Sequence, residues 1–133
     1  MDKLIDFTAL DTADMEVLAV SDNWQNRQLA AKSHRLPHGC VAGLVADTHA
    51  MVLEAIADHP DLTAEQIRTL AFSTYYTVRK QIARRSDTPD SILEILTADP
   101  MDRVSLAAHG QLHAREMRRN ERWGALVDAM AVA

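Results

Sequence analysis

Residues 49–63 read HAMVLEAIADHPDLT, and residues 75–89 read YYTVRKQIARRSDTP. Both stretches place a Val first, an Ile-Ala pair four residues later, and then an Asp with a Thr or Pro. The second stretch begins 26 positions after the first. Self-similarity at a fixed period of this size is the sequence signature of repeat proteins. A period of 26 residues is therefore expected along the rest of the chain as well.

The same period aligns four units of the sequence without gaps. One aligned position is always Leu, the position three before it is aliphatic or Met, and the position three after it is Ser or Asp. These positions are Leu18, Leu44, Leu70 and Leu96, with Met15, Val41, Ile67 and Leu93 before them and Ser21, Asp47, Ser73 and Asp99 after them. A Ser or Asp oxygen can accept a hydrogen bond from a first-turn amide of a helix. We therefore predict that the four Ser and Asp residues of this series are helix N-caps.

Apolar residues three or four apart share one face of a helix, and this spacing recurs in each unit. We predict a first helix over 11–20, 37–46, 63–72 and 89–98, each beginning at an Asp, Thr or Pro. We predict a second helix over 22–33, 48–58, 74–85 and 100–109. Helices this short are marginal in isolation, so neighbouring units must stack to bury their apolar faces.

The sequence thus predicts one all-α domain over 1–133, a right-handed α-solenoid of four 26-residue helical-hairpin repeats. The predicted divisions are an N-terminal cap over 1–10, repeats over 11–36, 37–62, 63–88 and 89–114, and a C-terminal cap helix over 115–133. Leu4, Ile5 and Phe7 are expected in a short helix that covers the first unit. Gly110 is expected to end the last second helix. An apolar stripe follows on the cap helix, made of Met117, Trp123, Leu126, Val127 and Met130.

The stretches LTAEQIRTLAFSTYYTVRKQIARRSD (62–87) and TPDSILEILTADPMDRVSLAAHG (88–110) resemble bacterial leucine-rich repeat variant proteins. They are also similar to short units of the wider HEAT and armadillo class. The resemblance covers residues 11–114 and implies a superhelix of paired helices whose concave surface holds a partner. Some members of the variant family carry an iron–sulfur cluster on an appended cysteine-rich segment. This chain has one cysteine, so no cofactor is expected.

The composition, 47% apolar and 25% charged, is that of an ordinary globular protein. The single cysteine, Cys40, excludes an internal disulfide, and no apolar run is long enough to span a bilayer. We therefore expect a cytoplasmic protein. The net charge of −5 argues against a general nucleic-acid binder. Residues 1–66 hold 11 acidic and 4 basic side chains, net −7, whereas residues 67–133 hold 8 and 10, net +2.

Two histidine groups are candidate metal ligands. His34, His38 and Cys40 fall within the stretch HRLPHGC and are residue types that bind zinc. A helix beginning at Pro37 would separate them, and a fourth ligand would have to come from a distant residue. We therefore favour packing and solvent exposure over a metal site.

The second group combines His109 and His113 with Glu116, at spacings that fit one helix face. The expected helix end at Gly110 would divide the two histidines, so we predict no metal here. The sequence also holds no glycine-rich phosphate loop and no recognised catalytic motif. We predict that the protein is not an enzyme.

A basic cluster is the candidate binding surface, and we expect another protein as its partner. The cluster consists of Tyr76, Arg79, Lys80, Arg84, Arg85 and Arg103. The alternative is a solvated face whose charges pair with nearby Asp and Glu. Arg is favoured at protein interfaces. We expect a monomer or a weak homo-oligomer.

Two other functions remain open. A HEAT-like protein could bind nucleic acid through a continuous basic groove. A small acidic inhibitor could instead occupy the nucleic-acid channel of a partner. In that case binding would use Asp11, Asp14, Glu16 and Asp22.

Overall fold

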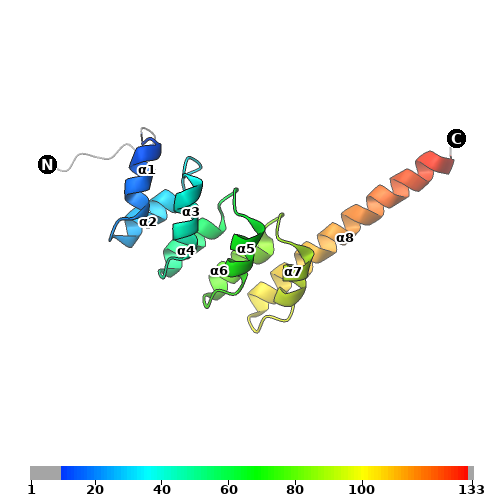
Figure 1. Ribbon diagram of the computed structural model, residues 1–133. Coiled ribbons are helices and arrows are strands. Elements are labelled where there is room, and N and C mark those ends of the chain that lie inside the picture. The colour runs from blue at the N-terminus through cyan, green and yellow to red at the C-terminus, as the bar shows by residue number, and fades with distance from the viewer. Residues whose placement is uncertain (1–9, 132–133) are drawn as a thin grey trace.

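The computed structural model describes residues 10–131, which form eight α-helices and no strand (Figure 1). The predicted all-α fold is confirmed. The first helices of each pair are α1 (Thr12–Ala19), α3 (His38–Val45), α5 (Ala64–Ala71) and α7 (Asp90–Leu96). The second helices are α2 (Trp24–Ala31), α4 (Ala50–Ala57), α6 (Tyr76–Arg84) and α8 (Asp102–Ala131). In both sets, the helix starts recur with the period of the sequence repeat.

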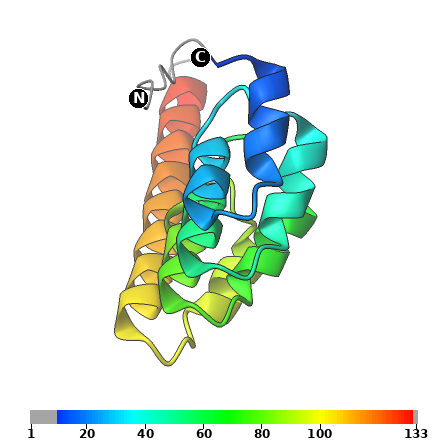
Figure 2. The ribbon, with the colours of Figure 1, turned by 90° about the vertical axis from the view of Figure 1, so that its left-hand side faces the viewer.

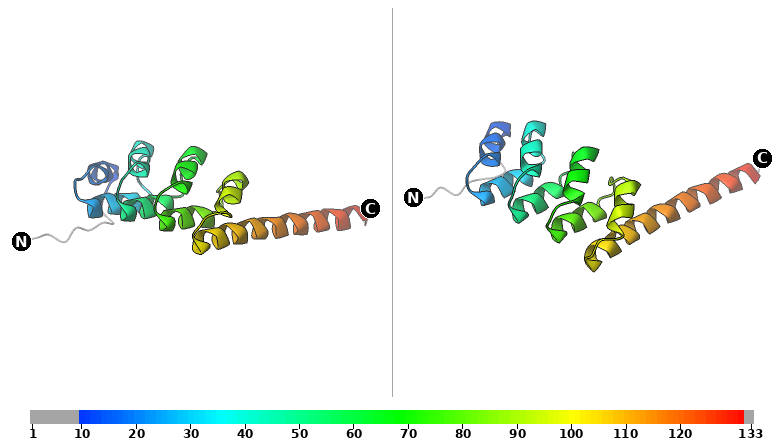
Figure 3. Two further views of the ribbon diagram at one scale, coloured as in Figure 1. Left: turned by 90° about the horizontal axis from the view of Figure 1, so that it is seen from below. Right: turned by 60° about the horizontal axis from the view of Figure 1, so that its bottom comes forward.

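The helices form two rows. α1, α3, α5 and α7 contact one another in sequence along one row, and α2, α4, α6 and α8 do so along the other. Figure 2 looks along the stack and shows the two rows side by side, and Figure 3 shows the first helices standing on the row of second helices. None of the helices in residues 10–131 is both long and apolar enough to cross a membrane. The predicted helix with Leu4, Ile5 and Phe7 lies outside the described residues.

The core lies between the rows and is built from the aligned apolar positions. Leu44, Leu70 and Leu96 are buried, and Leu18 is half-buried at the first pair. Burying one such side chain contributes about 1.5–3 kcal/mol. Thr88 is also buried, and it occupies the position that is Leu in the two preceding repeats, at Leu36 and Leu62. Its hydroxyl donates a 2.6 Å hydrogen bond to the carbonyl oxygen of Ile82, so the polar group is satisfied.

The starts of the first helices follow the sequence. Asp11, Pro37, Thr63 and Pro89 are the N-cap residues of these helices. Asp11 and Thr63 each form a reciprocal capping box with the residue three positions later.

The predicted N-caps of the second helices were two residues early. The N-caps of α2, α4 and α6 are Asn23, His49 and Tyr75. The predicted residues instead accept a hydrogen bond from the amide two positions later and so close the turn before each helix. These residues are Ser21, Asp47, Ser73 and Asp99.

The predicted helix end at Gly110 was wrong. α8 continues through Gly110 to Ala131 as one helix of 30 residues. Gly110 does not have a positive φ, and a Cβ added there would meet no atom within 4 Å. A glycine inside a helix costs only about 1 kcal/mol relative to Ala, which the surrounding helical residues offset. The half of α8 from residue 116 onward projects away from the stack as a single helix (Figure 3). We call residues 116–131 the tail.

Polar clamps join the helix pairs at their seams. Arg27 Nε lies 2.7 Å from Asp47 Oδ2 across the first seam, and Arg79 Nε lies 2.7 Å from Asp99 Oδ2 across the third. The intervening slot, one period after Arg27, holds the buried Leu53. The second seam is instead held by Arg85, whose Nη1 donates to the carbonyl oxygens of residues 57 and 59 at 3.0 and 2.6 Å.

Candidate functional site

The second helices present one continuous surface, which we call the second-helix face. Side chains three and seven residues apart project from one side of a helix, and the repeat places them in rows across the four helices. The rows are Gln25, Met51, Thr77 and Arg103; Gln28, Glu54, Lys80 and Leu106; and Lys32, Asp58, Arg84 and Gly110. All of these residues are exposed or half-exposed.

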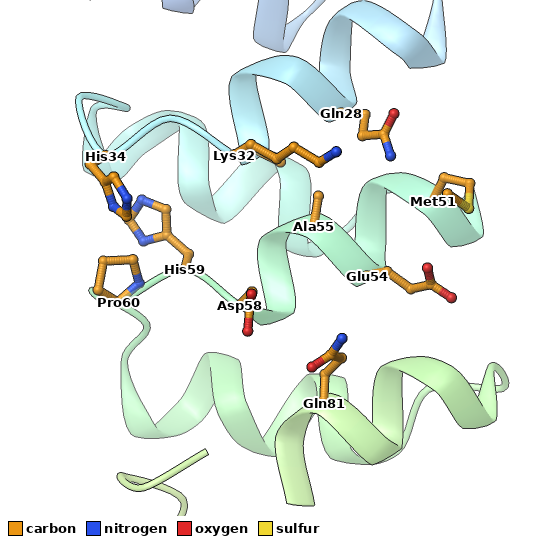
Figure 4. Close-up of a pocket in the computed structure, with 11 residues that line it drawn as sticks. Gln28, Lys32, His34, Met51, Glu54, Ala55, Asp58, His59, Pro60 and Gln81 are labelled. Carbon is orange, nitrogen blue, oxygen red and sulfur yellow. The ribbon is translucent and has the colours of Figure 1, made fainter. Parts of the chain in front are cut away.

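A groove of about 360 Å³ crosses this face between α2, α4 and α6. Figure 4 shows Lys32, the C-cap residue of α2, on one side of it and Gln81 from α6 on the other side. Glu54 from α4 and Asp58, the C-cap residue of α4, lie in its centre. The described residues contain no ion pair that involves either Glu54 or Asp58. The groove therefore has two carboxylates available at its centre.

Three members of the predicted basic cluster lie on the second-helix face. Lys80 and Arg84 project from α6 next to the acidic pair of α4, and Arg103 projects from the start of α8. No ion pair among residues 10–131 involves any of the three. The face therefore carries positive, negative and again positive charges from α2 to α8.

The other three members are held by contacts within the chain. Arg79 is bound to Asp99 and donates to the Ser73 carbonyl oxygen at 2.8 Å. Arg85 has a side chain only 8% exposed and is bound to two carbonyl groups and to Asp87. Tyr76 is half-buried against the core. Geometry thus divides the cluster into an available half and a half that stabilises the fold.

The acidic residues of the first helix pair are divided in the same way. Asp11 and Asp14 bond to each other's backbone amides at 2.9 and 3.0 Å. The bond from the Asp14 amide is the main cause that lowers the pKa of Asp11. Glu16 and Asp22 are exposed, and no ion pair within the described part of the chain involves them.

The candidate metal ligands do not gather into a group of three within residues 10–131. His34 and His38 are exposed, and Cys40 is half-buried. Burial raises the pKa of the Cys40 thiol, and the nearby Glu16 carboxylate raises it further, so the thiolate form that binds metals is disfavoured. His109 and His113 lie on the continuous α8 and not on either side of a bend. Residues 10–131 contain no group of three or more His, Cys, Asp or Glu side chains placed to hold a metal ion.

One buried histidine was missed by sequence reasoning. His59 is 3% exposed and accepts a hydrogen bond from the Asp61 amide at Nδ1, and its Nε2 has no hydrogen-bond partner within residues 10–131. Burial lowers the pKa of His59, Asp61 opposes this shift, and His34 adds to it. Figure 4 shows the rings of His34 and His59 near each other at one end of the groove.

The second-helix face is thus a charged, grooved surface, and the described residues contain no group of three or more side chains placed to hold a metal ion. Similarity to other proteins does not identify it further. The chain matches no protein-family model, no curated protein and no solved structure.

Proposed function

We propose that the chain is an α-solenoid of four helical-hairpin repeats that binds another protein through the second-helix face and catalyses no reaction. The solenoid assignment rests on helix starts that recur at the period of the sequence repeat and on the resemblance of residues 62–110 to leucine-rich repeat variant and HEAT-like units. Short helical hairpins stacked in this way form extended surfaces that suit a macromolecular partner.

The observation that carries the binding proposal is the charge arrangement of the second-helix face. Glu54 and Asp58 lie between Lys32 on one side and Lys80 with Arg84 on the other. A protein partner with the opposite order of charges would satisfy all of them, which favours specificity and rapid association. The apolar part of Met51 and Leu106 on the same face adds surface that is buried on binding.

Nucleic acid fits this face less well. A phosphate backbone needs a continuous positive surface, and each neutralised phosphate adds to the salt dependence of binding. The two carboxylates of α4 interrupt the basic rows at the centre of the groove. We therefore favour a protein partner over a nucleic acid.

The test compares two charge-reversal variants of the face with a control elsewhere on the chain. The face variants are Lys80→Glu with Arg84→Glu, and Glu54→Lys with Asp58→Lys. The control is Arg35→Glu with Arg68→Glu, since both arginines are exposed and lie outside the face. Each tagged protein is expressed in the host, and the proteins that co-purify with it are identified.

We expect a partner that wild type and the control retain and that both face variants lose. Retention of every partner by both face variants would refute the proposed surface. Gel-shift measurements with DNA and RNA at low and high salt provide the second arm. Tight, salt-sensitive binding that is lost only in the Lys80/Arg84 variant would favour the nucleic-acid function instead.

A further inference from the structure

The tail exposes an apolar stripe that no part of the described chain covers. Trp123 is 67% exposed, Leu126 51% and Met130 68%, and their spacing places them on one side of α8. Monomeric proteins rarely leave a contiguous stripe of large apolar side chains in water, and an apolar helix face gains most of its stability from packing. The stripe therefore calls for a partner surface.

The tail is also basic where the stripe begins. Arg118, Arg119 and Arg122 lie on one side of the helix, and together with Arg115 they line a hollow of about 340 Å³. Among the described residues, only Arg115 and Arg119 of these four form an ion pair, with the shared Asp90 at 2.6 and 3.4 Å. With Glu116 and Glu121 included, residues 115–122 carry a net charge of +2. Arg119 and Arg122 precede Trp123 and Leu126 by one helical turn or less. A matching surface must therefore be both apolar and acidic.

Helix α1 at the opposite end of the stack provides such a surface. Its outer side exposes Val17 by 70% and Val20 by 79%, with the exposed Glu16 beside them. Residues 11–19 contain three acidic side chains and no basic one. At the in-register positions of α3, the exposed residues are glycines and alanines, so no long side chain stands next to the valines.

The two surfaces cannot meet within one molecule. The tail leaves the stack beyond α7 and extends away from α1 (Figures 1 and 3). The far end of α8 and α1 therefore lie at opposite ends of the molecule in space. We propose that the tail of one copy packs on the outer side of α1 of a second copy. Trp123 and Leu126 cover Val17 and Val20, and the tail arginines pair with the acidic side chains of α1.

This contact joins two different surfaces, so it is heterologous. Each copy keeps an unused tail or an unused α1 face, and association continues head to tail into rings or filaments. The alternative is a pairing of two tails through the same stripe, which would close at a dimer. Charge favours the first arrangement, because residues 115–122 are net +2 and residues 11–19 are net −3, so these two segments attract each other. The tail as a whole holds three basic and three acidic side chains and is neutral, so two tails have no net attraction. This inference does not depend on the second-helix face.

Two variants that each destroy one surface distinguish these arrangements. Trp123→Asp removes the tail surface, and Val17→Asp with Val20→Asp removes the α1 surface. All three positions are exposed, so the variants are expected to keep wild-type helicity by circular dichroism. Leu106→Asp is the matched control, since Leu106 is 68% exposed but lies on the second-helix face.

Sedimentation velocity of the full chain over a wide concentration range is the measurement. We expect wild type and the Leu106 control to grow past dimers. Each surface variant alone should associate at least tenfold more weakly, the loss expected when a central aromatic anchor is removed. An equimolar mixture of the two variants should form a dimer and nothing larger, because it contains one intact tail and one intact α1 face per pair.

Three results would overturn the proposal. Wild type could stay monomeric at the highest concentration reached. The Val17/Val20 variant could associate as well as wild type, which would indicate tail-to-tail pairing. The mixture could fail to form a dimer although both variants are folded.

Discussion

Replacing Asp99 with Asn removes the charge and keeps the size of the side chain. The substitution therefore tests how much the Arg79–Asp99 ion pair stabilises the third seam. Asp99→Asn leaves an oxygen that can still accept the hydrogen bond from the Met101 amide, which is 2.9 Å long in wild type. The substitution therefore affects mainly the bond pair to Arg79, at 2.7 and 3.1 Å. Arg79→Met removes the other partner and keeps much of its apolar stem.

The expected coupling energy follows from the burial of the pair. Exposed ion pairs contribute about 0.2–1 kcal/mol, whereas breaking a fully buried pair costs about 3–5 kcal/mol. The side chains of Arg79 and Asp99 are 15% and 6% exposed, but they lie at the edge of a thin two-row stack where water screens them. The paired, two-point geometry favours the upper part of the exposed range. We expect a coupling of about 1 kcal/mol.

Urea denaturation followed by circular dichroism, applied to both single variants and the double variant, measures this coupling as a double-mutant cycle. Burial raises the pKa of Asp99, but the bonds from Arg79 and the Met101 amide outweigh it, so the pKa lies below the ordinary 3.8. The contribution of the pair is therefore complete above pH 4 and lost as the pH falls below this value. Additive single-variant effects at pH 7, or a coupling unchanged at pH 3, would refute the clamp.

Three further predictions concern stability. Wild type should lose stability as the pH falls below about 6.5, because the unfolded chain binds a proton at His59 more readily than the folded chain, whose His59 pKa is lowered. His59→Asn should reduce this loss, measured as the difference between urea midpoints at pH 7 and pH 5. An identical pH dependence of the two proteins would contradict the prediction. Gly110→Ala should stabilise the chain by about 0.5–1 kcal/mol, since the helix is continuous and the added methyl meets no atom within 4 Å; a destabilisation would indicate that the helix ends there. Leu70→Ala should lower the free energy of unfolding by about 2–5 kcal/mol, because it opens a cavity in the core. Thr69→Ala, at the exposed neighbouring position, should have little effect. Similar urea midpoints for the two variants would show that Leu70 is not in the core.

The register of the sequence repeat predicted the helix pattern well because burial imposes it. A leucine that recurs once in every repeat must fall on the inner side of each first helix, and Leu44, Leu70 and Leu96 are buried as expected. Helix ends were less predictable. Ser and Asp oxygens bond amides in turns and at helix N-termini alike, so Asp47 and Asp99 fit either position by sequence alone.

The continuous α8 was unpredictable for a different reason. A glycine such as Gly110 ends a helix when the backbone turns left-handed, and it merely weakens the helix when the backbone does not turn. The sequence around Gly110 does not distinguish the two cases, because tertiary packing decides whether the chain turns back at the glycine or continues as a helix. The contacts of Arg79 and Arg85 were unpredictable on similar grounds.

Arg79 and Arg85 read as surface charges because each also bonds to a partner in another repeat, Asp99 for Arg79 and the carbonyl groups of residues 57 and 59 for Arg85. Such contacts exist only once the helix pairs stack. A signal was nevertheless present. Arg27 and Arg79 are two periods apart, as are Asp47 and Asp99, so the same clamp is encoded at every second seam.

The three seams between helix pairs are held by two kinds of contact, ion pairs at the first and third and hydrogen bonds from Arg85 at the second, and these differ in their sensitivity to salt. Added ions screen the charge pairs at the first and third seams, whereas the bonds from Arg85 to neutral carbonyl groups at the second seam depend less on ionic strength. Concentrated salt is therefore expected to weaken the first and third seams more than the second. We therefore expect the bending stiffness of the stack to depend on ionic strength as well as on sequence.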